Sequence, residues 1–189
     1  MQSDSAPPRQ DAILDAAFGA FAAYGHRRTT MQDIARAAGL SRTALYLHFR
    51  SKDDIFRTLT ERYFEQALLD MEAALTLPGR STEDALYASF VAKDGAMMDV
   101  VLSTPHGAEL LDAGFSASPD LVRTAAARSA AVLCRWLEAR GLPPGLGPAQ
   151  RLADTIVAAL IGLKSSARSI GDLRAGEAQL ARLVARALG

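Results

Sequence analysis

The segment from Thr29 to Phe56, TTMQDIARAAGLSRTALYLHFRSKDDIF, restricts the possible fold more than any other part of this chain. Thr30 is followed three residues later by Asp33, which is the spacing of a capping box at the start of a helix. Ser41 is a second N-cap residue, and Gly39 between the two is a typical C-terminal stop. These signals predict two short helices that are separated by a tight turn.

The apolar residues of this segment indicate which faces of the two helices pack inward. Ile34, Ala35 and Ala38 recur at helical spacing, and the second helix is predicted from about 42 to 47. Leu45 and Phe49 are expected to face inward, which leaves four residues available to solvent: Arg42, Thr43, Tyr46 and His48. Two short helices with such a turn form the helix-turn-helix pattern, whose second helix can enter the major groove of DNA.

Helical patterns also fill the rest of the chain. Helices are predicted at about 9–25, 51–77, 81–102, 104–114, 118–140, 149–170 and 173–188, with a loop at 141–148 and a weak point at Gly95. The predicted fold is therefore all-α with about nine helices. We expect a disordered tail at 1–8, a three-helix DNA-binding domain at 9–55, and a larger helical regulatory and dimerisation domain at 56–189.

Composition and the start of the chain indicate the compartment. The lone Cys134 excludes an intramolecular disulfide framework and fits a reducing cytoplasm, where it is expected to act as a small buried apolar side chain. The first eight residues are polar and rich in proline, unlike a signal peptide. The longest uncharged run of the C-terminal half, 155–163, is too short to span a bilayer. We therefore expect a cytoplasmic protein without a membrane partner.

The zero net charge conceals an asymmetry between the two parts of the chain. Residues 1–52 carry seven basic and four acidic side chains, whereas the remainder carries fourteen basic and seventeen acidic ones. This is the sign expected if the N-terminal part meets phosphate and the C-terminal part does not. The asymmetry is small, so it supports DNA binding only mildly.

The motif TT-x-x-x-IA-x-x-A-G-L-S-x-x-x-LY-x-HF-x-x-K-x-x-I-F resembles the DNA-binding domain of the TetR family of bacterial transcriptional regulators. The segment from Arg9 to Gly25 resembles the first helix of that domain, so the likeness covers about residues 9–57. It implies a homodimeric repressor that binds a palindromic DNA operator and is released by a small-molecule effector. It implies no cofactor and no enzymatic activity.

The resemblance also implies which side chains contact DNA. Contacts of the recognition helix fall on Arg42, Thr43, Ala44 and Tyr46, with Leu47 at the edge of the groove, and phosphate contacts fall on Tyr46, His48 and Lys52. Thr30 and Gln32, at the start of the preceding helix, are expected to clamp the backbone, and Gln32 can also reach a base. The alternatives are that Arg42 is a solvated helix residue and that Tyr46 and His48 serve packing.

Two apolar stripes near the C-terminus predict the dimer interface. In this family the last two long helices form a four-helix bundle with those of a second subunit. The stripes comprise Leu152, Ile156, Leu160 and Leu163 in the first helix, and Leu180, Leu183, Val184 and Leu188 in the second. The alternative is that both stripes fill the core of a single subunit.

The effector, expected to be small and apolar or amphipathic, would occupy the C-terminal domain. Candidate pocket residues are Tyr87, Phe90, Asp94, Met97, Met98, His106, Phe115 and Trp136, with plain core packing as the alternative for each. His106 and Glu109 have a spacing that can bind a metal, but a single pair without a second cluster predicts no metal site.

Two other functions remain as alternatives to a ligand-responsive repressor. One is a DNA-binding regulator that is controlled by a protein partner or acts as an activator. The other, an all-α enzyme, is the weakest, because the sequence contains no nucleophile–base arrangement and no glycine-rich phosphate loop.

Overall fold

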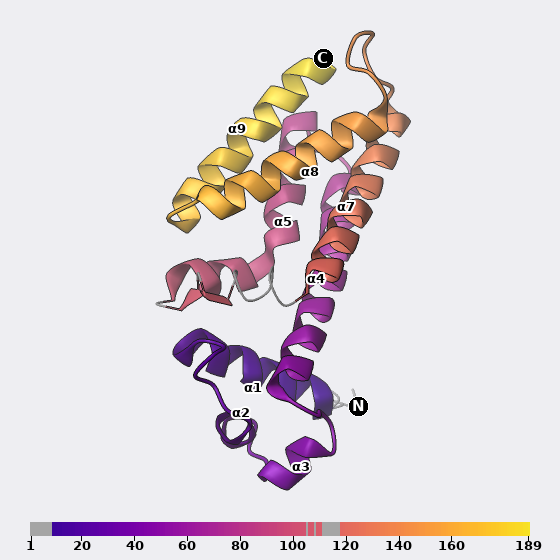
Figure 1. Cartoon of the computed structure of the whole chain (residues 1–189). Helices are drawn as coiled ribbons and strands as arrows, with labels where there is room; N and C mark the ends of the chain where they lie inside the picture. The colour runs from indigo at the N-terminus through magenta and orange to yellow at the C-terminus, as the bar shows by residue number, and fades with distance from the viewer. Residues whose placement is uncertain (1–8, 105, 108, 111–117) are drawn as a thin grey trace, which may run out of the picture. The chain divides into compact units, whose positions relative to one another are not determined.

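A computed structural model describes residues 9–104, 106, 107, 109, 110 and 118–189, with only the backbone at 96 and 97. Its helices are α1 (Arg9–Tyr24), α2 (Met31–Ala37), α3 (Arg42–Tyr46), α4 (Lys52–Thr76), α5 (Thr82–Ser103), α7 (Pro119–Arg140), α8 (Ala149–Ser166) and α9 (Ile170–Leu188) (Figure 1). The described residues contain no strand, and the predicted all-α fold is confirmed. The predicted tail at 1–8 and much of the predicted helix at 104–114 lie outside the described residues.

The chain divides into two compact units. Unit 1 comprises Met1–Arg62 with Ser103–Pro119, and unit 2 comprises Tyr63–Leu102 with Asp120–Gly189. The division falls inside α4, further along the chain than the predicted boundary at residue 55. The reason is that the start of α4 packs into unit 1: Leu59 is buried there, and Arg62 pairs with Asp11 and Asp15 of α1.

The core of unit 1 joins its first helices to the start of α4. Each element contributes fully buried apolar side chains, because apolar residues recur on one face of each helix. The largest of them are Ile13 and Phe21 of α1, Ile34 of α2, Leu45 of α3 and Ile55 of α4. Such a core fixes α2 and α3 relative to each other and to α1.

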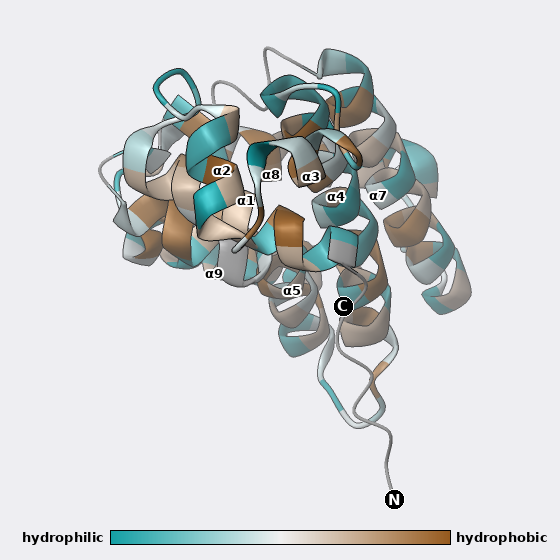
Figure 2. Cartoon of the chain, turned by 90° about the horizontal axis from the view of Figure 1, so that it is seen from below, coloured by the Kyte–Doolittle hydropathy of each residue, from teal (hydrophilic) through white to brown (hydrophobic). Residues whose placement is uncertain are grey.

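The core of unit 2 is one cluster of buried side chains from the second half of α4 and from α5, α7, α8 and α9. Its largest fully buried members include Met71, Phe90, Leu133 and Ile156. Each helix carries both hydrophobic and hydrophilic residues, so every one has a face for the core and a face for solvent (Figure 2).

Gly95 interrupts α5 at the predicted weak point. Its dihedral angles, φ 57° and ψ −177°, are far from helical and lie in a region that is open in practice only to glycine. Directly before the break, the hydroxyl of Tyr63 donates to the carbonyl oxygen of Asp94 at 3.1 Å. Helix α5 therefore consists of two helical pieces joined at Gly95.

The junction between α8 and α9 differs from the prediction. Helix α8 ends at Ser166, where a helix to about residue 170 was expected, and α9 begins at Ile170 instead of about 173. The cause is Ser169, whose hydroxyl accepts a hydrogen bond from the amide of Asp172 at 3.1 Å and so caps α9. Gly171 within the first turn does not prevent this start.

Candidate nucleic-acid interface

Helix α2 begins with the predicted capping box. The hydroxyl of Thr30 accepts from the amide of Asp33 at 3.2 Å, and the amide of Thr30 donates to Oδ2 of Asp33 at 3.0 Å. The hydroxyl of Thr30 also donates to this carboxylate at 2.6 Å, and these hydrogen bonds lower the pKa of Asp33. Thr30 therefore uses both its hydroxyl and its backbone amide to fix the start of α2.

A tight turn joins α2 to α3. Gly39 adopts a φ of 65°, which costs glycine little, and the amide of Leu40 donates to the carbonyl of Ala35 at 2.8 Å. The hydroxyl of Ser41 then accepts from the amide of Ala44 at 3.1 Å and caps α3. These hydrogen bonds, with the buried Leu45, hold α3 against α2 in a helix-turn-helix.

The outer face of α3 has the side chains that the sequence predicts. Arg42, Thr43, Tyr46, Leu47 and His48 are exposed and Ala44 is half-buried, whereas Leu45 and Phe49 are buried as expected. The guanidinium of Arg42 lies 5.6 Å from the centre of the Tyr46 ring, one helical turn further on, so the two contact as a cation–π pair. Leu47 is 83% exposed, which is unusual for leucine and leaves its side chain available to a partner.

Lys52 lies differently from the other predicted contacts. Its ammonium donates to the backbone carbonyl oxygens of His26 at 2.8 Å, Arg27 at 3.0 Å and Thr29 at 3.1 Å. An ammonium has three hydrogens, so this side chain has all of its donors in use within the protein. The geometry therefore does not support the predicted phosphate contact by Lys52, because its donors are used within the protein.

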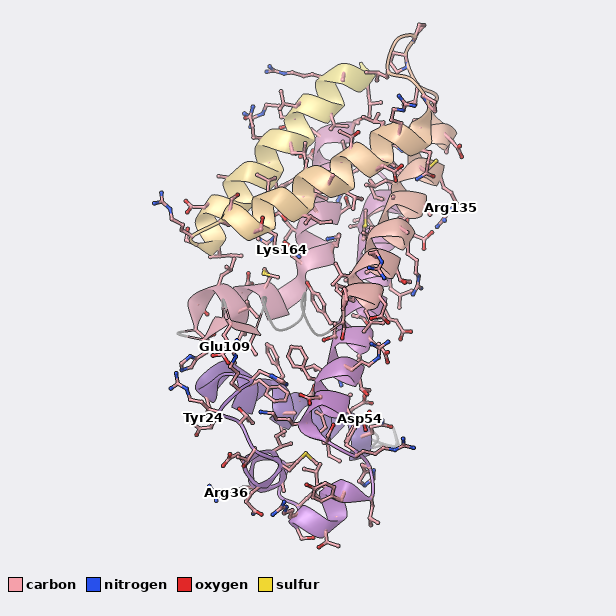
Figure 3. All side chains as sticks on the ribbon, in the orientation of Figure 1. Tyr24, Arg36, Asp54, Glu109, Arg135 and Lys164 are labelled. Carbon is pink, nitrogen blue, oxygen red and sulfur yellow. The ribbon has the colours of Figure 1, made fainter. Side chains whose placement is uncertain are left out.

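The structure adds basic residues that motif reasoning missed. Arg27 and Arg28 are exposed on the loop between α1 and α2, directly before the start of α2. Gln32, which the sequence did predict, is exposed on α2 itself. Arg36 is also exposed and lies 3.9 Å from Asp33 (Figure 3). The signal for the loop pair was present as two consecutive arginines before the first capping box.

Most predicted effector residues of unit 2 are core residues. Phe90, Met98 and Trp136 are buried, and Tyr87 packs half-buried against the same cluster. The indole nitrogen of Trp136 donates to the carbonyl of Leu75 at 3.0 Å, so its polar group is satisfied within the core. These four side chains fit the alternative of plain core packing.

The remaining predicted effector residues are not brought into that cluster. His106 belongs to unit 1, where it lines a hollow of about 250 Å³ with Ala23, Tyr24, Arg28 and Asp33. Its Nδ1 lies 3.9 Å from Oε2 of Glu109. Phe115 and the side chain of Met97 lie outside the described residues.

Asp94 is the centre of a buried group of charges in unit 2. It is 2% exposed, and Nζ of Lys164, which is labelled in Figure 3, lies 2.6 Å from its Oδ1. Arg174 lies 3.6 Å from its Oδ2. Lys93 approaches Oδ1 at 4.0 Å. Burial would raise the pKa of Asp94, but the charges of Lys164 and Lys93 outweigh it and lower the pKa.

Glu177 completes this group from α9. Its Oε2 lies 2.8 Å from Arg174, and the residue is 1% exposed. Burial raises its pKa to about 7 against the opposing hydrogen bond from Arg174. Oδ2 of Asp94 has no hydrogen bond to any described residue, so it can accept one from a protonated Glu177 or from a bound molecule. We define these residues, Lys93, Asp94, Lys164, Arg174 and Glu177, as the interior charge cluster.

The predicted interface stripes of α8 and α9 are divided between core and surface. Ile156, Leu160 and Val184 are buried in the core of the single subunit, where a partner cannot contact them. Leu152, Leu163, Leu180 and Leu188 are half-buried. Ile161 and Leu183 are the large apolar side chains of these two helices that are exposed, at 36% and 56%.

Known proteins resemble this chain in sequence and in fold. Residues 13–59 match the family model described as bacterial regulatory proteins, tetR family. The HTH-type transcriptional repressor ComR of Escherichia coli is 29% identical over 174 residues, which cover 87% of this chain and 81% of ComR. The HTH-type transcriptional repressor Rv1474c of Mycobacterium tuberculosis is 36% identical over 66 residues, 35% of each chain.

A solved structure agrees with these relatives. The TetR transcriptional regulator from Legionella pneumophila superposes with a TM-score of 0.72 at 15% identity, covering 98% of this chain and all of that one, which shows the shared fold. Within the described residues, none of the helices is long and apolar enough to cross a membrane. With the family match on the helix-turn-helix and this fold around it, residues 13–59 are a DNA-binding domain of the tetR family of bacterial regulatory proteins, and the chain is a DNA-binding transcriptional regulator.

Proposed function

We propose that this protein is a cytoplasmic, homodimeric repressor that binds a palindromic operator and is released by a small-molecule effector. The observation that carries the DNA-binding part is the outer face of α3. Its side chains are exposed on a helix whose position is fixed by two caps, a glycine turn and the buried Leu45. Such a rigid helix can be inserted into the major groove with little loss of conformational entropy.

The exposed residues of α3 divide between reading bases and positioning on phosphate. Arg42 is at the start of the helix, where a guanidinium can donate two hydrogen bonds to O6 and N7 of guanine. Thr43 and Ala44 are small enough to let the helix approach the bases, and Leu47 meets the groove edge. Tyr46 and His48 then donate to phosphates.

The start of α2 and the loop before it provide a second set of contacts. Gln32 is exposed one residue after the start of α2 and can reach the backbone or a base. Arg27 and Arg28 supply positive charge beside it, and guanidinium groups bind phosphate oxygens well. These cations also agree with the positive charge of the N-terminal part of the chain.

A palindromic operator requires two copies of the recognition helix. One short helix reads few base pairs, whereas two copies related by a two-fold axis read two half-sites that are one helical turn, or a multiple of it, apart. The exposed apolar side chains Ile161 and Leu183 on the last two helices give a surface for this pairing. We therefore place the subunit interface on the outward sides of α8 and α9.

Unit 2 has features of an effector domain. A hollow of about 500 Å³ is lined by residues of α4, α5 and α9, among them Gly95, Asp99 and Arg174. Arg174 belongs to the interior charge cluster, so a molecule in this hollow would lie next to buried charges at the break in α5. An effector that binds one arrangement of this region better than another would change DNA affinity.

The experiment that tests this function is selection of bound fragments from a random DNA pool, repeated at two salt concentrations. Recovery of a palindrome would support both the DNA-binding surface and the dimer. Recovery of a single half-site would count against the dimer, and no enrichment at either salt concentration would contradict sequence-specific binding altogether. Weak binding that disappears at the higher salt is the signature of phosphate contacts alone.

A further inference from the structure

The loop between α1 and α2, residues 25–30, is held from one side by the ammonium of Lys52. The three carbonyl oxygens that accept from it belong to His26, Arg27 and Thr29, which lie 23–26 residues before it in the chain. These carbonyls are outside any helix, so the helical ladder does not supply their donors. Lys52 supplies three donors from a single point.

The position of Lys52 on its own helix makes this arrangement informative. Lys52 is the first residue of α4, where the helix dipole disfavours a positive charge, and the next two residues are the aspartates that this place favours. The three carbonyl dipoles compensate the ammonium where the helix itself does not. The ammonium of Lys52 is therefore stabilised by the loop and not by the helix to which Lys52 belongs.

The rest of the loop is tied down by contacts of other kinds. The hydroxyl of Thr29 donates to the carbonyl of Gly25 at 2.8 Å, and the ring of His26 packs against Phe21 and Phe56, at 5.2 and 4.6 Å between centres. The loop ends at Thr30, the N-cap of α2. Any displacement of the loop therefore moves the first residue of the helix-turn-helix.

We propose that Lys52 is a positioning residue for DNA binding, which fixes the α1–α2 loop and through it the start of α2, and does not itself contact phosphate. The proposal rests on the proposed function, since it assigns a role within the same DNA-binding unit. It differs from a phosphate contact in what it predicts for salt. A lost phosphate contact reduces the magnitude of the slope of log affinity against log salt by about 0.9 for each bound subunit, whereas a displaced helix lowers affinity without changing the number of phosphate contacts.

The test compares Lys52→Met with Arg50→Met. Both remove one positive charge, but Arg50 is exposed, and the hydrogen bond described for it runs from its backbone amide to Oδ2 of Asp54 and not to the loop. Hydrogen–deuterium exchange is measured first on the free protein. In Lys52→Met the amides of residues 26–31 are expected to exchange about tenfold faster or more, because three charge-assisted hydrogen bonds are lost, and in Arg50→Met at the wild-type rate.

DNA binding is then measured over a range of salt concentrations, with the selected operator or, without one, random duplex DNA. For Lys52→Met we expect affinity to fall about tenfold with an unchanged salt slope. Wild-type exchange in the loop, or a slope whose magnitude falls by about one for each bound subunit, would overturn the proposal. Because exchange is measured without DNA, it separates a failure of the positioning role from a failure of the proposed function.

A folding defect in Lys52→Met does not prevent the test. Lys52→Arg keeps the charge and a long aliphatic stem, but a flat guanidinium cannot direct three donors from one atom to three carbonyls. We expect faster exchange in residues 26–31 of this variant as well. Wild-type exchange and wild-type affinity in Lys52→Arg would show that charge alone suffices, and the positioning role would be rejected.

Discussion

Lys164 places its ammonium 2.6 Å from a carboxylate oxygen of Asp94, and both side chains are withdrawn from solvent at 11% and 3% exposure. The pair joins α8 to the residue directly before the break in α5. Two buried charges in such a pair compensate each other, but each would be costly alone. The interior charge cluster is therefore a place where single substitutions act strongly.

Substitution of Asp94 by Ala should destabilise the protein strongly. It leaves the buried ammonium of Lys164 without the carboxylate that lies 2.6 Å from it, and loss of one partner from a buried ion pair costs about 3–5 kcal/mol. Urea unfolding followed by circular dichroism measures the change. The matched control is Asp99→Ala, whose side chain is 58% exposed and also lies near Arg174; it should cost less than about 1 kcal/mol. Equal effects of the two variants would contradict the argument.

Stability should depend on pH through Glu177. Its pKa is raised to about 7 in the folded protein from 4.5, so between these values the folded chain holds a proton that the unfolded chain has released. The free energy of unfolding should therefore fall as pH rises through this interval and level off above it. The groups that face Glu177 are Arg174 on its own helix, Lys93 and Asp94 on α5, and Lys164 on α8.

The variant Glu177→Gln isolates this contribution. Glutamine is neutral at every pH and can donate to Oδ2 of Asp94 as a protonated glutamate does. Burial lowers the pKa of His26 in unit 1, which acts in the opposite direction, but both proteins share this term. The difference in unfolding free energy between variant and wild type should grow by roughly 1–3 kcal/mol between pH 5 and pH 7. A constant difference would exclude a raised pKa.

Arg42→Ala should relax sequence preference. We expect the loss of about 1–3 kcal/mol of discrimination at one guanine position of each half-site, with little change in affinity for random DNA. Binding of the selected operator and of variants at that position measures it. An equal loss on operator and on random DNA would assign Arg42 to phosphate instead.

Gly25 and Gly39 both have positive φ values, of 80° and 65°, but different surroundings. A Cβ on Gly39 would meet nothing, so Gly39→Ala should cost only the backbone strain of about 1–2 kcal/mol. A Cβ on Gly25 would lie 2.5 Å from Oε2 of Glu109, whose Oε1 accepts from the amide of Arg27 at 3.1 Å. Gly25→Ala should therefore add the loss of this hydrogen bond, about 1–2 kcal/mol more.

A double-mutant cycle distinguishes the two contributions at Gly25. If the added methyl displaces the carboxylate of Glu109, removal of that carboxylate first makes the substitution cheaper. The costs of Gly25→Ala and Glu109→Ala should then be less than additive in unfolding free energy. Strict additivity would show that the methyl group is accommodated without moving Glu109.

Leu183→Glu should weaken self-association. A carboxylate on the exposed side of α9 would have to be desolvated in an apolar contact between subunits. Light scattering at micromolar concentration should show a dimer for wild type and a monomer for the variant. Leu69→Glu, on α4 at 62% exposure, is the matched control and should remain dimeric. A wild-type monomer would contradict the proposed interface.

Sequence predicted what depends on neighbouring residues. The capping box at Thr30, the stop at Gly39 and the cap at Ser41 are local, and each formed as expected. The helical period then placed Leu45 inside and Arg42 outside. Much of the local structure of the helix-turn-helix is therefore determined by fewer than twenty consecutive residues.

Features that depend on distant residues were harder to predict. The partners of Lys52 lie more than twenty residues away, so a motif that places a lysine near DNA could not show that its donors are already occupied. In α8, the helical period places Ile156 and Leu160 on one apolar face. It does not show whether this chain or a partner subunit covers that face. Tertiary packing decided both.

The break at Gly95 has a mechanical consequence for the whole of α5. A continuous α-helix is stiff because its hydrogen bonds run along the axis, so a displacement of one end also moves the other end. Helix α5 lacks that continuity at Gly95 and consists of two helical segments joined at this residue. The piece that begins at Thr82 and the piece that leads to residue 103 are therefore not coupled through one continuous helix.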